Sequence, residues 1–162
     1  MTKVAEKGAT TQVYRVYIKA SPQQIWDAIT RPEWNRRYAF GTPIEYDLRK
    51  GGAYRATASE QMQQAGAPPV IFEGEVLEAL APSRLVHTQK AVWEANEPAS
   101  TVTYEIVEGR PGVAVLTVTH DLEGAPNHAA MVAGETEEGG GGWPEVLSDL
   151  KSLVETGEPL YG

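Results

Sequence analysis

The chain has 162 residues, of which 41% are hydrophobic and 22% charged, and this composition is typical of one globular domain spanning residues 1–162. The absence of cysteine excludes disulfides, thiolate metal sites and a cysteine nucleophile. The net charge of -8 disfavours a nucleic-acid partner, because phosphates select basic surfaces. No apolar run is long enough for a signal peptide or stable membrane insertion, so we expect a cytoplasmic protein.

The acidic excess is concentrated in one part of the chain. Residues 94–142 contain nine acidic side chains and a single basic one, Arg110. We interpret this as a solvated acidic face, with a site for a cation or a basic partner as the alternative.

The first elements alternate between strand and helix. Residues 1–10 are polar and are expected to be disordered, and the alternation in "QVYRVYIK", residues 12–19, predicts a strand with one buried side. "ASPQQIWDAIT" then predicts a helix, because Ser21, Pro22 and Gln24 supply a cap, a first-turn proline and a capping box. A second short helix or turn follows and carries Trp34 and Tyr38.

Strands dominate the middle of the chain, and short turns separate most of them. The expected strands are residues 43–48, 52–60, 70–79, 84–93, 100–108 and 113–121. Gly51 and Gly52 predict a tight hairpin between the first two. Successive strands joined by short turns form an antiparallel sheet with one buried face.

The C-terminal part predicts a long helix preceded by a flexible segment. Apolar residues recur at helical spacing from Trp143 to Val154, and Gly157 ends the pattern. The four glycines at 139–142 disfavour a helix that continues from Pro126, since each costs about 1 kcal/mol relative to alanine. We therefore expect the helix to begin between Gly141 and Trp143. Residues 126–141, with one or two helical turns after Pro126, are expected to form a mobile lid and hinge.

Together these elements predict an α+β protein in which a curved antiparallel sheet is wrapped around the C-terminal helix. The order is one strand, two short helices, six strands and the long helix. A curved sheet covered by one helix commonly leaves a cavity between the two.

Five segments in this order resemble the START-like superfamily of helix-grip folds, and within it the branch named after the C-terminal domain of the activator of Hsp90 ATPase. They are "IKASPQQIWDAITRPEWNRRY", "YDLRKGGAYR", "FEGEVLEALAPSRLVHT", "LTVTHDLEG" and "GGWPEVLSDLKSLVETGEPL". The resemblance implies a helix-grip fold. It also implies an activity among those of lipid and hormone carriers, polyketide cyclases and aromatases, or bacterial proteins of unassigned role.

Aromatic side chains and two histidines are the candidate ligand contacts. A cavity lined by aromatic rings with a few polar groups suits the binding of a flat, small hydrophobic molecule. His87 and His120 alternate with apolar neighbours and are expected to point inward, whereas His128 is expected in a loop. The candidate residues are Trp34, Tyr38, Phe40, Tyr54, Phe72, His87, Trp93, Tyr104, His120, Trp143 and Leu147.

Three functions remain open at this point. The leading one is binding of a small hydrophobic or aromatic ligand. The second is an enzyme of the cyclase or hydrolase type, with His120 as acid or base and Tyr54 or Tyr104 as proton donor. The third is a stress-related co-chaperone or interaction module. No metal or other cofactor is expected, since no ligand pair has metal-site spacing, and the protein is expected to be a monomer or weak homodimer.

Overall fold

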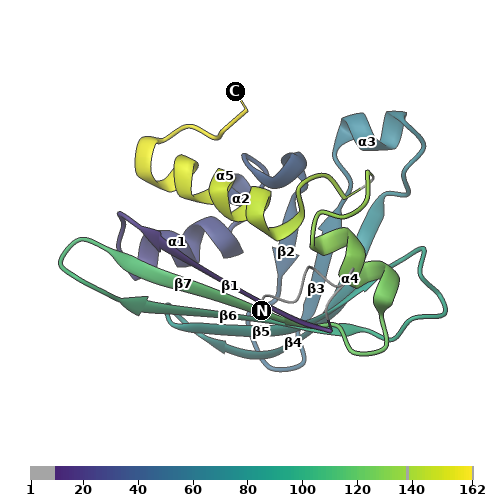
Figure 1. Cartoon of the computed structure of the whole chain (residues 1–162), viewed down its shortest axis with the longest axis horizontal. Helices are drawn as coiled ribbons and strands as arrows, with labels where there is room; N and C mark the ends of the chain where they lie inside the picture. Colours follow the sequence, from purple (N-terminus) through teal and green to yellow (C-terminus); the bar gives the residue numbers. More distant parts are fainter. Residues whose placement is uncertain (1–9, 138, 162) are drawn as a thin grey trace, which may run out of the picture.

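A computed structural model describes residues 10–137 and 139–161, so the disorder expected for residues 1–10 concerns a segment that, apart from Thr10, lies outside them. Seven antiparallel strands form one sheet in the order β1-β7-β6-β5-β4-β3-β2. The helices gather on one side of this sheet, with α5 lying across it and α4 beside one end (Figure 1). The α+β helix-grip architecture expected from the sequence is confirmed.

The element bounds follow the predicted order closely. The strands are β1 Thr11–Ile18, β2 Ile44–Tyr46, β3 Ala53–Thr57, β4 Val70–Leu80, β5 Arg84–Ala91, β6 Ser100–Glu108 and β7 Ala114–Asp121. The helices are α1 Pro22–Thr30, α2 Pro32–Asn35, α3 Glu60–Gln64, α4 Pro126–Val132 and α5 Gly142–Thr156, with one 3₁₀ turn at Ala39–Gly41.

Helix α1 begins where its capping residues predict. The Ser21 side chain accepts a hydrogen bond from the Gln24 backbone N–H, and the Gln24 side chain accepts one from the Ser21 N–H. These two bonds satisfy donors that a helix start otherwise leaves free. The inner face of α1, including Ile25 and Ile29, is then buried against the sheet.

Helix α5 begins at Gly142 and ends before Gly157, which adopts the left-handed conformation that favours glycine at this position. Its inward side chains Trp143, Leu147, Leu150 and Leu153 are buried. They pack on residues of α1, β6 and β7 and complete the main core. No helix crosses the glycines, and the predicted start of α5 is confirmed.

Three local predictions differ from the structure. Strand β2 covers Ile44–Tyr46 rather than residues 43–48, so the longer loop 47–52, and not a tight turn at Gly51 and Gly52 alone, joins it to β3. Strand β3 ends at Thr57 rather than at residue 60, because Ser59 accepts a hydrogen bond from the Met62 N–H and starts the short helix α3. His128 lies in α4 and is 3% exposed, so its expected position in a loop is wrong.

Candidate ligand-binding cavity

A cavity of about 360 Å³ lies between the curved sheet and its helical cover. The sheet contributes mainly from β2, β3 and β4, and the cover contributes from α3, α4 and the start of α5. None of the described residues that line this cavity carries a charged side chain. The lining is Ile29, Asn35, Tyr38, Ala39, Phe40, Thr42, Ile44, Tyr46, Tyr54, Ala56, Met62, Ala67, Ile71, Phe72, Gln89, Trp93, Tyr104, Met131, Val132, Gly139, Gly142, Trp143 and Val146.

The sequence-predicted candidates fall into two groups. Seven line the cavity, namely Tyr38, Phe40, Tyr54, Phe72, Trp93, Tyr104 and Trp143. The other four, Trp34, His87, His120 and Leu147, are absent from its lining. Trp34 packs against the core beneath the Arg37 guanidinium, which lies 5.2 Å from its ring. Leu147 instead lines a separate groove of about 600 Å³ between β1 and α5.

A strained turn holds Phe40 at the rim of the cavity. Ala39 and Phe40 both have positive φ angles, 52° and 69°, a conformation that disfavours residues with a side chain. The buried Asp149 carboxylate on α5 accepts hydrogen bonds from the backbone N–H groups of Ala39 and Leu160, at 2.9 Å and 2.8 Å. Phe40 lines the cavity and is 46% exposed. The turn therefore fixes a large apolar ring at the boundary between cavity and solvent.

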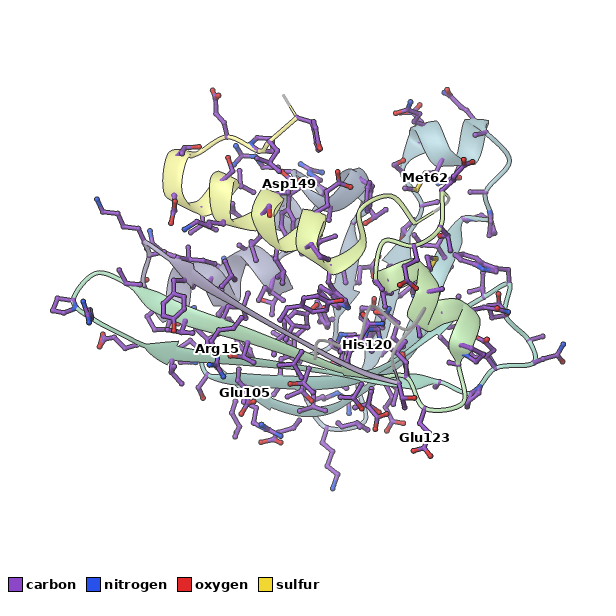
Figure 2. The ribbon with its side chains drawn as sticks, viewed as in Figure 1. Arg15, Met62, Glu105, His120, Glu123 and Asp149 are labelled. Atoms are coloured by element: carbon purple, nitrogen blue, oxygen red, sulfur yellow. The ribbon has the colours of Figure 1, made fainter. Side chains whose placement is uncertain are left out.

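His120 links the sheet to α5 through two hydrogen bonds. The Trp143 indole N–H donates to His120 Nδ1 at 3.0 Å, and His120 Nε2 lies 2.8 Å from the Ser100 hydroxyl. Because an indole can only donate, Nδ1 must lack a proton, so the neutral ring carries its proton on Nε2. Ser100 can then accept from Nε2 and donate to the Gln89 carbonyl at 2.9 Å. Figure 2 shows His120 between the sheet and the helices, whereas Glu123 points away from them.

A second polar chain connects the cavity wall to α4. The Tyr54 hydroxyl donates to the Gln89 side-chain oxygen at 2.8 Å, and the Gln89 nitrogen lies 3.1 Å from His128 Nε2. The amide nitrogen can only donate, so the neutral His128 ring carries its proton on Nδ1. His128 also stacks on Phe72, with ring centroids 5.5 Å apart. His128 therefore connects α4 to the cavity wall. The sequence pattern did not predict this role, because α4 is too short to show a helical repeat.

Helix α4 has no capping side chain of its own, and a distant residue supplies one. Ala125 at its start cannot accept a hydrogen bond through its side chain. The buried Glu97 carboxylate, from the loop between β5 and β6, accepts from the N–H groups of Asn127 and His128 at 2.8 Å and 3.1 Å. An anion at a helix N-terminus also interacts favourably with the helix dipole. Glu97 therefore fastens α4 over the cavity.

Two buried polar atoms without hydrogen-bond partners lie beside the tyrosines that line the cavity. His87 Nδ1 lies 2.8 Å from the Thr88 carbonyl oxygen, so it must carry the proton and donate. Among the described residues, the buried His87 Nε2 makes no hydrogen bond. The buried Tyr46 hydroxyl makes none of good geometry, but burial and an interaction with Tyr104 raise the pKa of Tyr46. Tyr46 was not a candidate from the sequence. The hairpin between β2 and β3 pairs Tyr46 with Tyr54, and this pairing could have identified Tyr46 as a candidate.

The surroundings of the cavity disfavour charge. Burial lowers the pKa of His87 to about 4, that of His120 to about 3 and that of His128 to about 4. Burial also raises the pKa values of Tyr104, Tyr46 and Tyr54 above their usual range. All these side chains are neutral near pH 7. The site therefore offers neutral hydrogen-bonding groups rather than ions.

The geometry does not suit proton transfer between His120 and a molecule in the cavity. Both of its ring nitrogens are engaged, and the ring is fully buried outside the cavity lining. Within residues 10–137 and 139–161, no group of three or more histidine, aspartate or glutamate side chains could hold a metal ion. Over the same ranges, no helix is long and apolar enough to cross a bilayer.

The fold and cavity define a helix-grip protein with a cavity between its sheet and helical cover that is lined by aromatic and other uncharged side chains. Residues 19–155 match the family described as activator of Hsp90 ATPase homolog 1-like protein, and the chain belongs to this family. No relative was found among curated protein sequences.

Solved structures of the same fold come from several organisms. CalU16 from Micromonospora echinospora is 20% identical, with a TM-score of 0.61, and the match covers 90% of this chain and 76% of that one. An HSP90 activator from Plasmodium falciparum is 21% identical, with a TM-score of 0.60 and coverages of 80% and 89%. Protein MLL2253 from Mesorhizobium loti is 19% identical, with a TM-score of 0.68 and coverages of 89% and 96%. At these identities the likeness shows the fold alone.

Proposed function

We propose that this protein binds a small, flat hydrophobic or aromatic molecule in the cavity between the sheet and its helical cover. The observation that carries this proposal is the cavity of about 360 Å³ with an aromatic and uncharged lining. Ligand sites are commonly mostly apolar cavities with a few placed polar groups. The planar rings of Tyr54, Phe72 and Tyr104 offer surfaces for stacking against a flat ligand.

A cavity-filling variant with a matched control tests this function. Ala56 and Ala53 lie on the same strand, but Ala56 is buried and lines the cavity whereas Ala53 is exposed. We expect 2-naphthol to bind the full chain and to shift the Trp143 indole N–H resonance. Ala56→Leu should weaken this binding at least about tenfold, and Ala53→Leu should leave it unchanged. Equal binding by both variants, or no binding of any naphthalene to the wild type, would refute the cavity function.

A second candidate is a protein-interaction role of the co-chaperone type, supported by the family description and by a row of apolar side chains on the outer face of the sheet. Tyr17 on β1 and Val107 on β6 both pair with Val115 on β7, and they are 59% and 57% exposed. An exposed apolar row of this kind favours a protein partner. Stimulation of Hsp90 ATPase activity that is lost in Tyr17→Glu would support this role. Absence of stimulation by the wild type would exclude it.

A further inference from the structure

A tyrosine hydroxyl in the cavity lining has a proton that no described residue receives. We propose that the cavity selects neutral aromatic molecules that carry a hydrogen-bond acceptor, such as a carbonyl oxygen, and that the Tyr104 hydroxyl donates to it. This inference rests on the proposed binding function and specifies the chemistry of its ligand.

Tyr104 lies on the inward face of β6, at a place where the packing gives way to the cavity. Its neighbours on that face, Val102 and Ile106, are 0% and 2% exposed. Tyr104 packs against the same core but is only partly buried, and it lines the cavity. The exposed part of an inward-facing side chain faces the cavity. The ring itself is held by Trp143 and His87, whose ring centroids each lie 6.0 Å away.

The Tyr104 oxygen accepts from a neighbouring tyrosine, which leaves its own proton available. Burial raises the pKa values of Tyr46 and Tyr104, and the hydrogen-bonding interaction between them raises that of Tyr46 further but lowers that of Tyr104. This is the effect expected when the Tyr46 hydroxyl donates and the Tyr104 oxygen accepts. Within the described part of the chain, the Tyr104 hydroxyl donates no hydrogen bond. A ligand acceptor in the cavity would supply the missing partner.

The amide side chains of the lining are already engaged, so they favour no ligand donor. The Asn35 side-chain oxygen accepts from the Ile44 N–H at 2.9 Å, and that of Gln89 accepts from the Tyr54 hydroxyl at 2.8 Å. A ligand that only donates would compete with these bonds, whereas a ligand acceptor meets an unused donor at Tyr104. No described lining residue carries a charged side chain, which favours a neutral acceptor over an anion.

Two ligands of nearly the same shape isolate this contact. 2-Acetylnaphthalene has a carbonyl oxygen where 2-isopropenylnaphthalene has a CH₂ group. We expect the full chain to bind the ketone at least as tightly as the alkene, because the bond from Tyr104 replaces those that the carbonyl loses from water. Tyr104→Phe should weaken binding of the ketone at least about tenfold and that of the alkene by less than about twofold, since only the ketone is left with a buried unpaired acceptor.

Tyr38→Phe is the matched control. Tyr38 also lines the cavity, but its hydroxyl donates to the Ala28 carbonyl at 3.0 Å and has no proton left for a ligand. This variant should therefore change the affinities for the ketone and the alkene by the same factor. Circular dichroism of both variants checks that they are folded.

The infrared carbonyl band of the bound ketone gives a second readout that does not depend on affinity. It should lie at lower wavenumber in the wild type and in Tyr38→Phe than in Tyr104→Phe, because a donated hydrogen bond weakens the C=O bond. A wild-type band at the position found in hexane would overturn the inference even if Tyr104→Phe does not fold.

The two ligands and 2-naphthol together distinguish this inference from the proposed function. If all three bind the wild type, and Tyr104→Phe weakens the ketone and the alkene alike, the cavity binds ligands but this selection for an acceptor is wrong. If none of the three binds, the cavity function fails and this inference fails with it.

Discussion

As the pH is lowered, this protein should begin to lose stability at a higher pH than protonation of its carboxylates alone would cause. The reason is that three histidines are buried in neutral form. Burial holds the pKa values of His87, His120 and His128 at about 4, 3 and 4, below the ordinary value of 6.5. The unfolded chain therefore binds protons first as the pH falls. The stability associated with these groups is complete above about pH 6.5 and is lost as the pH falls toward 4.

The size of the effect follows from the same pKa values. Between pH 7 and pH 5 each histidine stays neutral in the folded protein but titrates in the unfolded chain, which lowers the free energy of unfolding by about 2 kcal/mol per histidine. The three together give a loss of roughly 6 kcal/mol, a large part of the roughly 5–15 kcal/mol typical of a domain. Glu145 and Glu155 have lowered pKa values below 4.5, so their loss falls at lower pH.

Urea denaturation at pH 7, 6 and 5, at constant ionic strength and followed by tryptophan fluorescence, measures this loss. His87→Phe removes one titrating group and should reduce the pH-dependent loss by about a third, whatever its effect on stability at pH 7. The ¹⁵N resonances of the three imidazole rings should report neutral side chains down to pH 5. A loss below about 2 kcal/mol between pH 7 and pH 5, or a charged ring in the folded protein at pH 6, would refute the reasoning.

Three further substitutions test the links between the sheet and its cover. Trp143→Phe leaves His120 Nδ1 without a donor and should lower the free energy of unfolding by about 1–3 kcal/mol, measured by urea denaturation, with a change of His120 tautomer in ¹⁵N spectra. Glu97→Ala removes the acceptor for two N–H groups of α4 and should cost about 1–2 kcal/mol while speeding hydrogen exchange within α4 more than within α5. Gly142→Ala places a methyl group 2.3 Å from the Val132 carbonyl oxygen at a φ of 64°, and should cost at least about 2 kcal/mol. Gly112→Ala has a similar φ of 82° but open space around it, so a smaller loss in thermal unfolding is expected; equal losses would contradict the close-packing argument.

The spacing of apolar residues predicted the long strands and the long helix, because each of these elements buries one regular face. Strand β7 alternates between buried and partly buried side chains from Ala114 to His120, and α5 carries an apolar stripe that the structure buries. The start of α1 was also predictable, because its capping hydrogen bonds join residues that are close together in the sequence around Ser21. Short elements were less accessible, since α3 depends on one Ser59 hydrogen bond and α4 depends on Glu97, which lies about thirty residues away in the chain.

The site was predictable as a set of aromatic side chains but not as a hydrogen-bonded arrangement. Inward alternation identified His87 and His120 as buried, but it could not show that Trp143 would occupy one nitrogen of His120. The same limit applies to Tyr46, which becomes part of the wall only through its pairing with Tyr54 across the hairpin. Such contacts join residues that are distant in sequence, and no local pattern encodes them.

The placement of these contacts also constrains how a ligand could enter. Helix α4 is attached at its start by Glu97 and in its middle by Gln12, whose side chain donates to the Ala129 carbonyl at 2.9 Å. Helix α5 is attached by the bond between Trp143 and His120. The mobility of residues 126–141 stays a prediction, and residue 138 lies outside the described residues; the described residues between the two attachments include Gly134 and the glycines 139–141. Gly140 lies against the Phe40 ring, since a methyl group there would be 2.9 Å from that ring. Opening at this contact would widen the rim of the cavity while both helices keep their hydrogen bonds to the rest of the protein.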